Sequence, residues 1–337
     1  MSRRWLIRLG LLAVALVVTY VVVQLVGKVD WAEVRSSLGH LDWWQAPVLF
    51  AVLVGRQVLN ALPLSLYIPG VSPLRATQND QVAILMSTVA PPPSDIALRM
   101  AMFSSWGVPV AKGMAGTIMN TLTFYIVRFG APAVGFVLLA ITGGELGYRL
   151  ADLLSIAISV GILVGVLLVV RSDALARTVG TKAGRVARRV RRTVDPASWA
   201  EACVRFRGDV ASRFHRGFPR SLLALAAMLL VDLALLVMCL RFVGLSAAEV
   251  GAVHIAIAYL FAYPFTIFPF SGIGIVDALI LAGIVAAAGV EAEAAAVAGL
   301  VVWRVFTIGG PLALGAVSLA AWRRTSSTAE AGSGSAS

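Results

Sequence analysis

Long apolar stretches alternate along the chain with short polar or Pro/Gly-rich segments. About 20 apolar residues in a helix are enough to span the hydrocarbon core of a bilayer. Stretches of this length predict six full transmembrane helices, at about residues 6–26, 45–66, 110–142, 150–170, 219–241 and 291–322. The first stretch has no Ala-x-Ala exit, which favours a retained helix over a cleaved signal peptide. The pattern therefore predicts an all-α polytopic membrane protein.

Other apolar segments are too short to cross a bilayer, and they occur in two pairs. The pairs cover about residues 73–90 with 96–106, and 250–268 with 273–288. A Pro-rich tip, Pro91-Pro92-Pro93, joins the first pair, and a Gly-rich tip around Gly272 joins the second. Each pair is typical of a re-entrant helical hairpin, whose non-helical tip is tolerated in a membrane only against protein or a wet cavity. Residues 28–42 have amphipathic spacing and predict a short surface helix.

The two predicted hairpins also match each other in sequence. Asp95 and Asp277 each lie 12 residues before a Gly-Val pair, at Gly107 and Gly289. Each Gly-Val pair comes directly before a long predicted helix. A break is predicted in the middle of each helix, at Gly130-Ala131-Pro132 and at Gly309-Gly310-Pro311. Similar endings follow, beginning at Gly135 and at Gly315. These matches indicate two repeats, at about 43–142 and 219–322.

Domain boundaries follow from the same pattern. We expect a single integral membrane domain over residues 1–322, in which a basic linker at 171–218 joins the repeats. The tail at 323–337 is rich in Ser, Gly and Ala, which predicts disorder. Small residues along 291–322 permit close helix packing, and a homo-oligomer is one possible result.

Composition supports the membrane assignment. Hydrophobic residues make up 59% of the chain and charged residues 13%, with a mean hydropathy of +0.88. Soluble domains are about 25% charged, so this chain needs lipid as its solvent. The formal net charge is +11. Residues 171–220 hold 13 Lys/Arg and 4 Asp/Glu, a net charge of 13 − 4 = +9.

Charge also predicts the orientation. Cytoplasmic segments of membrane proteins carry an excess of Lys and Arg. The basic linker and the termini are therefore expected in the cytoplasm of a bacterial cell, with the protein in the inner membrane. Arg75 and Lys112 border the first hairpin, whereas Glu249 and Glu291 border the second. The hairpins should then open to opposite sides, so the repeats are predicted to be inverted, as in many transporters. The linker itself is interpreted as a topology signal or a helix on the anionic leaflet, rather than as a nucleic-acid site.

Several charged residues fall within or beside the apolar segments. One such charge at the bilayer centre costs roughly 2.5–3.5 kcal/mol, so these side chains must pair with each other or line water. Buried ion pairs that lock the hairpins to the long helices are one interpretation, and substrate contacts are the other. The candidate substrate-binding residues are Asp95, Arg99, Asp277, Arg304, Ser94, Ser271, Gly272, Asn120, Arg56 and Asp232. Arginine suits phosphate because its planar fork donates two parallel hydrogen bonds.

Chemistry of other kinds finds little support in the sequence. The chain has no Gly-rich phosphate loop, no His-Glu-x-x-His and no Gly-x-Ser-x-Gly. Its three histidines are scattered, and its two cysteines, Cys203 and Cys239, suggest neither a disulfide framework nor a metal cluster. We therefore expect a protein that is not an enzyme and that uses no metal and no cofactor.

The tips carry a family resemblance. Pro92, Ser94, Asp95 and Arg99 form the first element, and Pro269, Gly272, Gly274 and Asp277 form the second, with Arg304 in the following helix. The chain resembles, over about residues 6–322, the transmembrane domain of lysylphosphatidylglycerol synthases, which also occurs alone in flippase-like membrane proteins. Both acids are Asp where the family usually has Glu, and Ser94 stands where Gly is usual. Near Asn120 the family often has an acid–Arg pair.

The resemblance implies movement of a lipid between leaflets. The sequence includes no aminoacyl-transferase domain, so lysyl transfer is not implied. Our first hypothesis is a flippase-like transporter for an anionic lipid, either a phospholipid or a polyprenyl-phosphate-linked lipid. Asp95 and Asp277 are the natural proton carriers if transport is coupled to protons. The alternatives are a membrane partner of an envelope or lipid-modifying enzyme that does not itself transport, and a small-solute permease.

Overall fold

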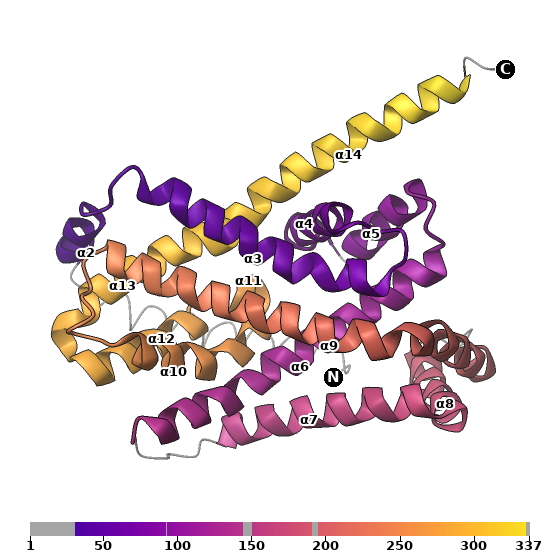
Figure 1. Ribbon diagram of the computed structural model, residues 1–337, viewed down its shortest axis with the longest axis horizontal. Helices are drawn as coiled ribbons and strands as arrows, with labels where there is room; N and C mark the ends of the chain where they lie inside the picture. Colours follow the sequence, from indigo (N-terminus) through magenta and orange to yellow (C-terminus); the bar gives the residue numbers. More distant parts are fainter. Residues whose placement is uncertain (1–30, 92, 144–149, 191–194, 335–337) are drawn as a thin grey trace, which may run out of the picture. The chain divides into compact units, whose positions relative to one another are not determined.

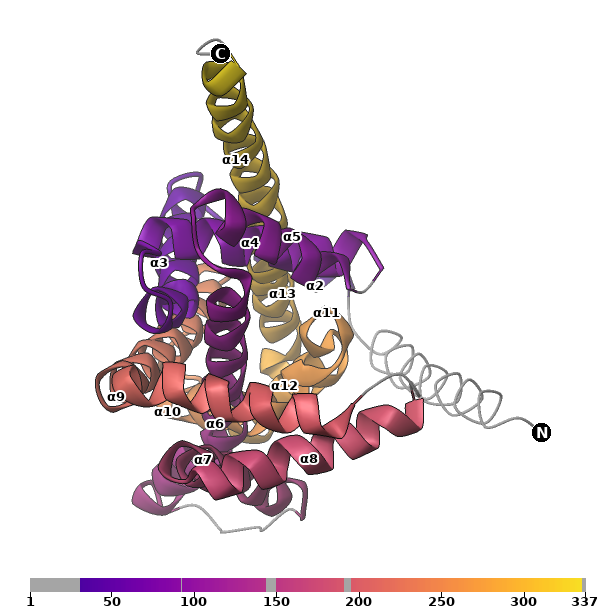
Figure 2. The ribbon, with the colours of Figure 1, turned by 90° about the vertical axis from the view of Figure 1, so that its right-hand side faces the viewer.

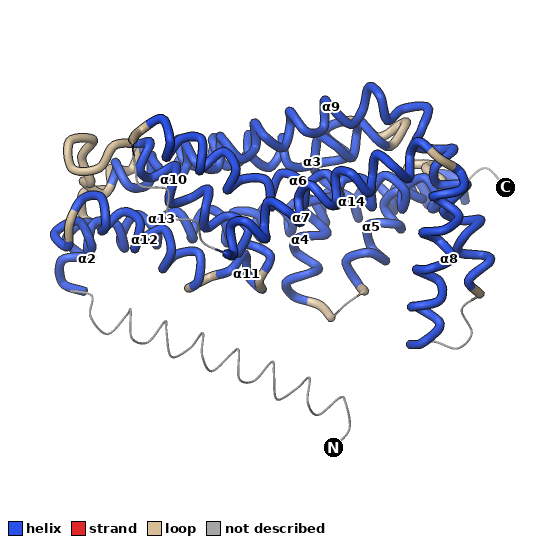
Figure 3. Tube along the Cα trace, turned by 90° about the horizontal axis from the view of Figure 1, so that it is seen from below, coloured by secondary structure: helices blue, strands red, loops and turns tan. Residues whose placement is uncertain are grey.

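The described part of the chain is built from helices. The computed structural model describes residues 31–91, 93–143, 150–190 and 195–334. Every regular element in these ranges is a helix, as Figures 1 and 3 show. The all-α membrane fold predicted from the apolar pattern is thereby confirmed. The predicted first span at 6–26 and Pro92 of the first tip lie outside the described residues.

The helices follow in this order: α2 (Trp31–Leu38), α3 (Gln45–Tyr67), α4 (Pro73–Val89), α5 (Ser94–Ser105), α6 (Val110–Ile141), α7 (Leu150–Arg171), α8 (Asp173–Val190), α9 (Pro196–Phe242), α10 (Ala252–Ala262), η1 (Tyr263–Ile267), α11 (Pro269–Gly272), α12 (Ile275–Ala288), η2 (Val290–Ala292), α13 (Glu293–Arg304), η3 (Val305–Gly309) and α14 (Gly310–Gly334). Helix α2 falls within the predicted amphipathic segment at 28–42.

Five stretches of helix in the described residues are long and apolar enough to cross a membrane. They are 45–67, 110–141, 217–242, 269–288 and 290–325. Four of the five coincide with predicted spans. The fifth, 269–288, joins the tip segment α11 to the second arm of the second hairpin, and its backbone is interrupted by non-helical residues in the tip. The predicted span at 150–170 corresponds to α7, whose residues 153–165 form a shorter apolar helix.

Both pairs of short apolar segments fold as helical hairpins. Helices α4 and α5 pack against each other, joined by a short turn, as Figure 2 also shows. Helices α10 and α12 form the second hairpin, with η1 and α11 at its tip. In this tip Phe270 and Ser271 have φ of 51° and 56°, the left-handed region that side chains other than glycine seldom adopt. The depth of the hairpins in a membrane remains a prediction.

The predicted break at Gly130-Ala131-Pro132 is wrong, since α6 continues through Pro132 as one helix. A proline cannot donate the hydrogen bond of its missing N–H, and neighbouring hydroxyls compensate such gaps in membrane helices. The carbonyl that loses its helical donor is that of Arg128, four residues earlier, and two hydroxyls of α7 contact the carbonyls beside it. Ser155 Oγ donates to the carbonyl of Phe129 at 3.1 Å, and Ser159 Oγ donates to that of Ile126 at 2.8 Å. At the second predicted break, the backbone forms the π-helical segment η3 just before Pro311.

The chain forms two compact units, each assembled from three separate segments. Unit 1 contains residues 1–53, 131–153 and 232–309, and unit 2 contains residues 54–130, 154–231 and 310–337. The hairpin α10–α12 therefore belongs to unit 1, and the hairpin α4–α5 belongs to unit 2. Each unit thus pairs one hairpin with segments that are distant from it in the sequence.

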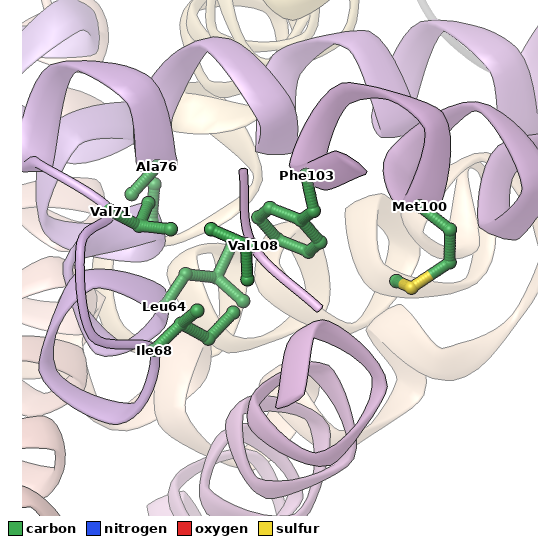
Figure 4. Close-up of a cluster of buried hydrophobic side chains, with 8 residues drawn as sticks. Leu64, Ile68, Val71, Ala76, Met100, Phe103 and Val108 are labelled. Atoms are coloured by element: carbon green, nitrogen blue, oxygen red, sulfur yellow. The ribbon is translucent and has the colours of Figure 1, made fainter. Parts of the chain in front are cut away.

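A hydrophobic core of unit 2 lies between α3, the first hairpin and the residues that lead into α6. Leu64, Ile68, Phe103 and Val108 are buried there, and Figure 4 shows their side chains pointing toward one another. Helix α14 packs along α4 in the same unit. This packing holds α4, with its polar residues, between two neighbours.

Composition predicted disorder after residue 322, whereas the structure continues α14 as a helix to Gly334. The stretch includes Ala329 and Ala331 and follows directly on an established helix. Propagation of a helix adds one hydrogen bond per residue without a new nucleation cost. The helix therefore extends into a stretch whose composition alone favours disorder.

Candidate functional site

Unit 2 contains a buried polar centre around Arg99, which we call the Arg99 centre. The Arg99 guanidinium donates from Nη2 to Asp80 Oδ1 at 3.0 Å and from Nη1 to Asn79 Oδ1 at 2.9 Å. Asn79 Nδ2 in turn donates to the backbone carbonyl of Arg99 at 3.1 Å. Asn60 Nδ2 donates to Asp80 Oδ2 at 2.8 Å. Both carboxylate oxygens of Asp80 are thus hydrogen-bonded, which offsets the cost of burying its charge.

Helix α4 supplies the polar core of this centre through four consecutive residues, Gln78-Asn79-Asp80-Gln81. Asn79, Asp80 and Gln81 are no more than 4% exposed. Four consecutive helical residues cover a full turn, so α4 needs polar partners on more than one side. Gln57 of α3 donates from Nε2 to Gln81 Oε1 at 3.1 Å, and Gln78 donates to the carbonyl of Ser318 in α14. The sequence therefore folds into a network rather than a single ion pair.

Asp95, the predicted site residue nearest to Arg99 in the sequence, is not its ion-pair partner. Asp95 lies in the first turn of α5 and is half-buried. Within the described ranges, no hydrogen bond or ion pair joins the Asp95 side chain to another residue. Its neighbour Ser94 donates from Oγ to the carbonyl of Pro91 at 2.6 Å and so stabilises the tip. The Arg99 carboxylate partner is Asp80, which sequence reasoning missed.

Unit 1 contains a second polar centre around Arg304, which we call the Arg304 centre. Arg304 Nε donates to Asp277 Oδ1 at 2.6 Å, and Nη1 donates to the carbonyl of Ser271 at 3.3 Å. The backbone N–H of Gly274 donates to Asp277 Oδ2 at 2.7 Å. Arg304 thus connects α13 to the tip of the second hairpin. Asp277, Arg304 and Ser271, all predicted site residues, are brought together here.

The Arg304 guanidinium is not fully used by these contacts. Arg304 is 8% exposed, and its Nη2 is buried with no hydrogen-bond partner in the described part of the chain. The guanidinium lies 4.6 Å from the centre of the Trp303 ring. A buried donor without a partner costs free energy, so this nitrogen keeps a hydrogen-bonding capacity that the described residues do not use.

Gly272 shapes the same tip. Its φ is +67°, and a Cβ at this position would lie 2.4 Å from the carbonyl oxygen of Phe265. Only glycine has both the left-handed freedom and the small size that this turn requires. The tip therefore brings backbone carbonyls close to Arg304 and leaves no room for a side chain at Gly272.

The remaining predicted residues lie at other contacts. Asp232 of unit 1 is buried, and Tyr259 donates to its Oδ2 from the hydroxyl at 2.8 Å. In unit 2, Arg56 donates from Nη1 to Gln57 Oε1 at 2.6 Å. Asn120, also in unit 2, has a buried Oδ1 with no partner in the described ranges. Asp232, Arg56 and Asn120 thus form no hydrogen bond shown here with Arg99 or Arg304.

Sequence reasoning missed Asn79, Asp80, Gln57 and Gln81. A signal was present, because four polar residues in a row at 78–81 interrupt a segment that was treated as apolar. No group of three or more His, Cys, Asp or Glu residues that could hold a metal ion occurs in the described part of the chain. Each of the two centres is built around an arginine guanidinium.

Comparison with known proteins gives one match. A family model described as the lysylphosphatidylglycerol synthase TM region matches residues 5–315. No curated protein and no solved structure matches the chain. The match covers every residue of both polar centres except Ser318, whose carbonyl accepts from Gln78.

Proposed function

The chain belongs to the family of lysylphosphatidylglycerol synthase transmembrane regions, and from this membership we propose that it moves an anionic lipid between the leaflets of a membrane. The cargo is a phospholipid or a polyprenyl-phosphate-linked lipid. The observation that carries the proposal is the buried Arg304, whose Nη2 has no partner in the described residues although Nε and Nη1 are engaged. Such a nitrogen is a ready donor to a phosphate oxygen.

Competition for the guanidinium provides the mechanism. A phosphate that approaches Arg304 takes the place of the Asp277 carboxylate or adds to it, because arginine can serve two acceptors with its fork. Arg99 offers the same exchange against Asp80. The headgroup then passes along polar groups while the acyl chains stay in the bilayer. When the headgroup leaves, the carboxylate returns and restores a neutral buried pair.

The proposal includes inverted repeats, an architecture that permits alternating access. The similar segments that begin at Gly135 and Gly315 make similar contacts. A Cβ at Gly135 would lie 3.4 Å from Leu260 Cβ in α10, and one at Gly315 would lie 2.7 Å from Leu85 Cβ in α4. Each glycine thus contacts the first arm of the other repeat's hairpin. We infer re-entrant hairpins that open to opposite sides of the bacterial inner membrane, with both termini in the cytoplasm.

A lipid-scrambling assay on purified protein in liposomes tests the proposal. Arg304→Gln and Arg99→Gln should abolish the movement of a fluorescent anionic lipid while the protein still inserts, because each removes the phosphate donor. Arg323→Gln serves as the matched control, since Arg323 is exposed in α14 and belongs to neither centre. Normal transport in both centre variants would contradict the proposal.

The same assay separates the alternatives. A protein that inserts correctly but never moves lipid is better explained as a partner of an envelope or lipid-modifying enzyme. Inhibition by water-soluble anions, with no effect of competing lipids, identifies a small-solute permease. Asp95 and Asp277 are the proposed proton carriers, and a transport rate that does not change with pH would exclude proton coupling.

A further inference from the structure

The strongest charge on the chain lies outside both polar centres, in α8. This helix has five basic residues and one acidic residue, a net charge of 5 − 1 = +4. Arg177, Lys182, Arg185 and Arg188 are all exposed. Neither centre uses any of these side chains. The proposed transport mechanism therefore leaves this charge without a role.

The basic residues share the helix with an apolar face. In the sequence, Leu175, Val179, Val186 and Val190 recur at intervals of four, seven and four residues, which places them along one side of a helix. Arg177, Arg185 and Arg188 fall on the remaining circumference, and Lys182 lies at the edge of the apolar side, from which its long side chain can reach lipid headgroups. A nucleic acid attracts a basic face through its phosphates, but it does not bury an apolar helix face. A membrane interface uses both, because headgroups meet the charges and acyl chains meet the apolar side.

Chain connectivity keeps α8 beside the membrane. The apolar helix α7 ends at Arg171, and α8 begins two residues later at Asp173. Figure 2 shows this direct succession. The chain returns to a membrane-spanning stretch at Gly217. A helix tethered so closely has a bilayer surface within reach at all times.

We propose that α8 docks on the membrane surface by binding anionic lipid headgroups, as a peripheral site distinct from the two buried centres. Charge complementarity selects anionic over zwitterionic lipids, and each cation near such a surface favours docking roughly fivefold. The attraction is screened by salt, because the Debye length falls to about 4 Å near 0.5 M. The proposal does not depend on lipid transport.

Hydrogen–deuterium exchange of the full chain in nanodiscs tests the docking. Amides of residues 173–190 should exchange more slowly when about a third of the phosphatidylcholine is replaced by phosphatidylglycerol. The double variant K182Q/R185Q should lose most of this slowing, and high salt should remove it. The variant R323Q/R324Q loses the same charge from exposed positions of α14 and should behave as the unmodified chain does. Unchanged exchange in peptides of α4 and α5 would show that the variants are folded.

Three results would overturn the proposal. Equal exchange in the two lipid mixtures would show that anionic headgroups are not bound. Equal loss of slowing in both double variants would assign the effect to net charge instead of α8. If exchange of the α8 amides does not change with phosphatidylglycerol but becomes slower on addition of RNA, α8 is a nucleic-acid site instead.

Discussion

The carboxylate of Asp80 lies 3.0 Å from the guanidinium of Arg99, so the acid that serves Arg99 comes from the opposite arm of its own hairpin. The two side chains are 6% and 12% exposed. This pair ties α4 to α5 in a place where water cannot replace a lost partner. The hairpin is therefore held together by a charged contact as well as by apolar packing.

Removal of one partner should destabilise unit 2. Asp80→Asn leaves the Arg99 charge buried without its carboxylate, and the loss of one partner of a buried pair costs about 3–5 kcal/mol. Asp95→Asn is the matched control, because the Asp95 side chain is half-buried and forms no hydrogen bond or ion pair with a described residue. Thermal unfolding in detergent measures both. Equal destabilisation by the two variants would show that the Asp80–Arg99 pair is not the important contact.

Substitution in the second tip separates crowding from backbone strain. Gly272→Ala forces a Cβ to within 2.4 Å of the Phe265 carbonyl, at a positive φ. Gly70→Ala has a similar φ of +83° but open space around it. The left-handed conformation alone costs roughly 1–2 kcal/mol. We expect Gly272→Ala to lower the free energy of unfolding by clearly more than Gly70→Ala does. Similar losses at both sites would mean that the tip relaxes freely.

The loop between α9 and α10 should respond to acid through Glu249. A hydrogen bond from the Ser246 side chain, joined by one from its backbone N–H at 2.6 Å, holds the pKa of Glu249 below its ordinary value of 4.5. A lowered pKa means that the ionised form stabilises the fold above the unfolded pKa and that this stability is lost as the pH falls through the folded pKa.

The variant Glu249→Gln makes this dependence measurable. It should unfold more easily than the unmodified chain near about pH 6, and this difference should shrink as the pH falls through the folded pKa of Glu249. A Glu249→Gln effect that persists in acid would assign the stabilisation to packing instead of to the carboxylate.

The helices could be predicted from the sequence because the length of an apolar run is a local property. The Asp277–Arg304 pair could also be predicted from the sequence, because the second tip and the following helix each contain one charged residue in an apolar stretch. The role of Asp80 could not be predicted, because its two partners, Asn60 and Arg99, lie 20 and 19 residues away in the sequence. Asp95 lies only four residues from Arg99 and was the more obvious candidate. Helix α6 continues through Pro132, where hydroxyls from α7 bond nearby carbonyls, and no pattern within α6 predicts these contacts.

The discontinuous make-up of the two units constrains how the protein is made. Unit 1 needs residues as distant as 45–53 and 232–309, and unit 2 needs the segment that starts at Gly310. Unit 1 cannot reach its final packing until the chain has been made as far as Gly309, and unit 2 must wait for the segment after it. Early helices must therefore wait in the translocon or in the bilayer with unpaired polar groups such as Gln78, whose acceptor is the carbonyl of Ser318. This places a demand on insertion that a protein with sequential domains does not face.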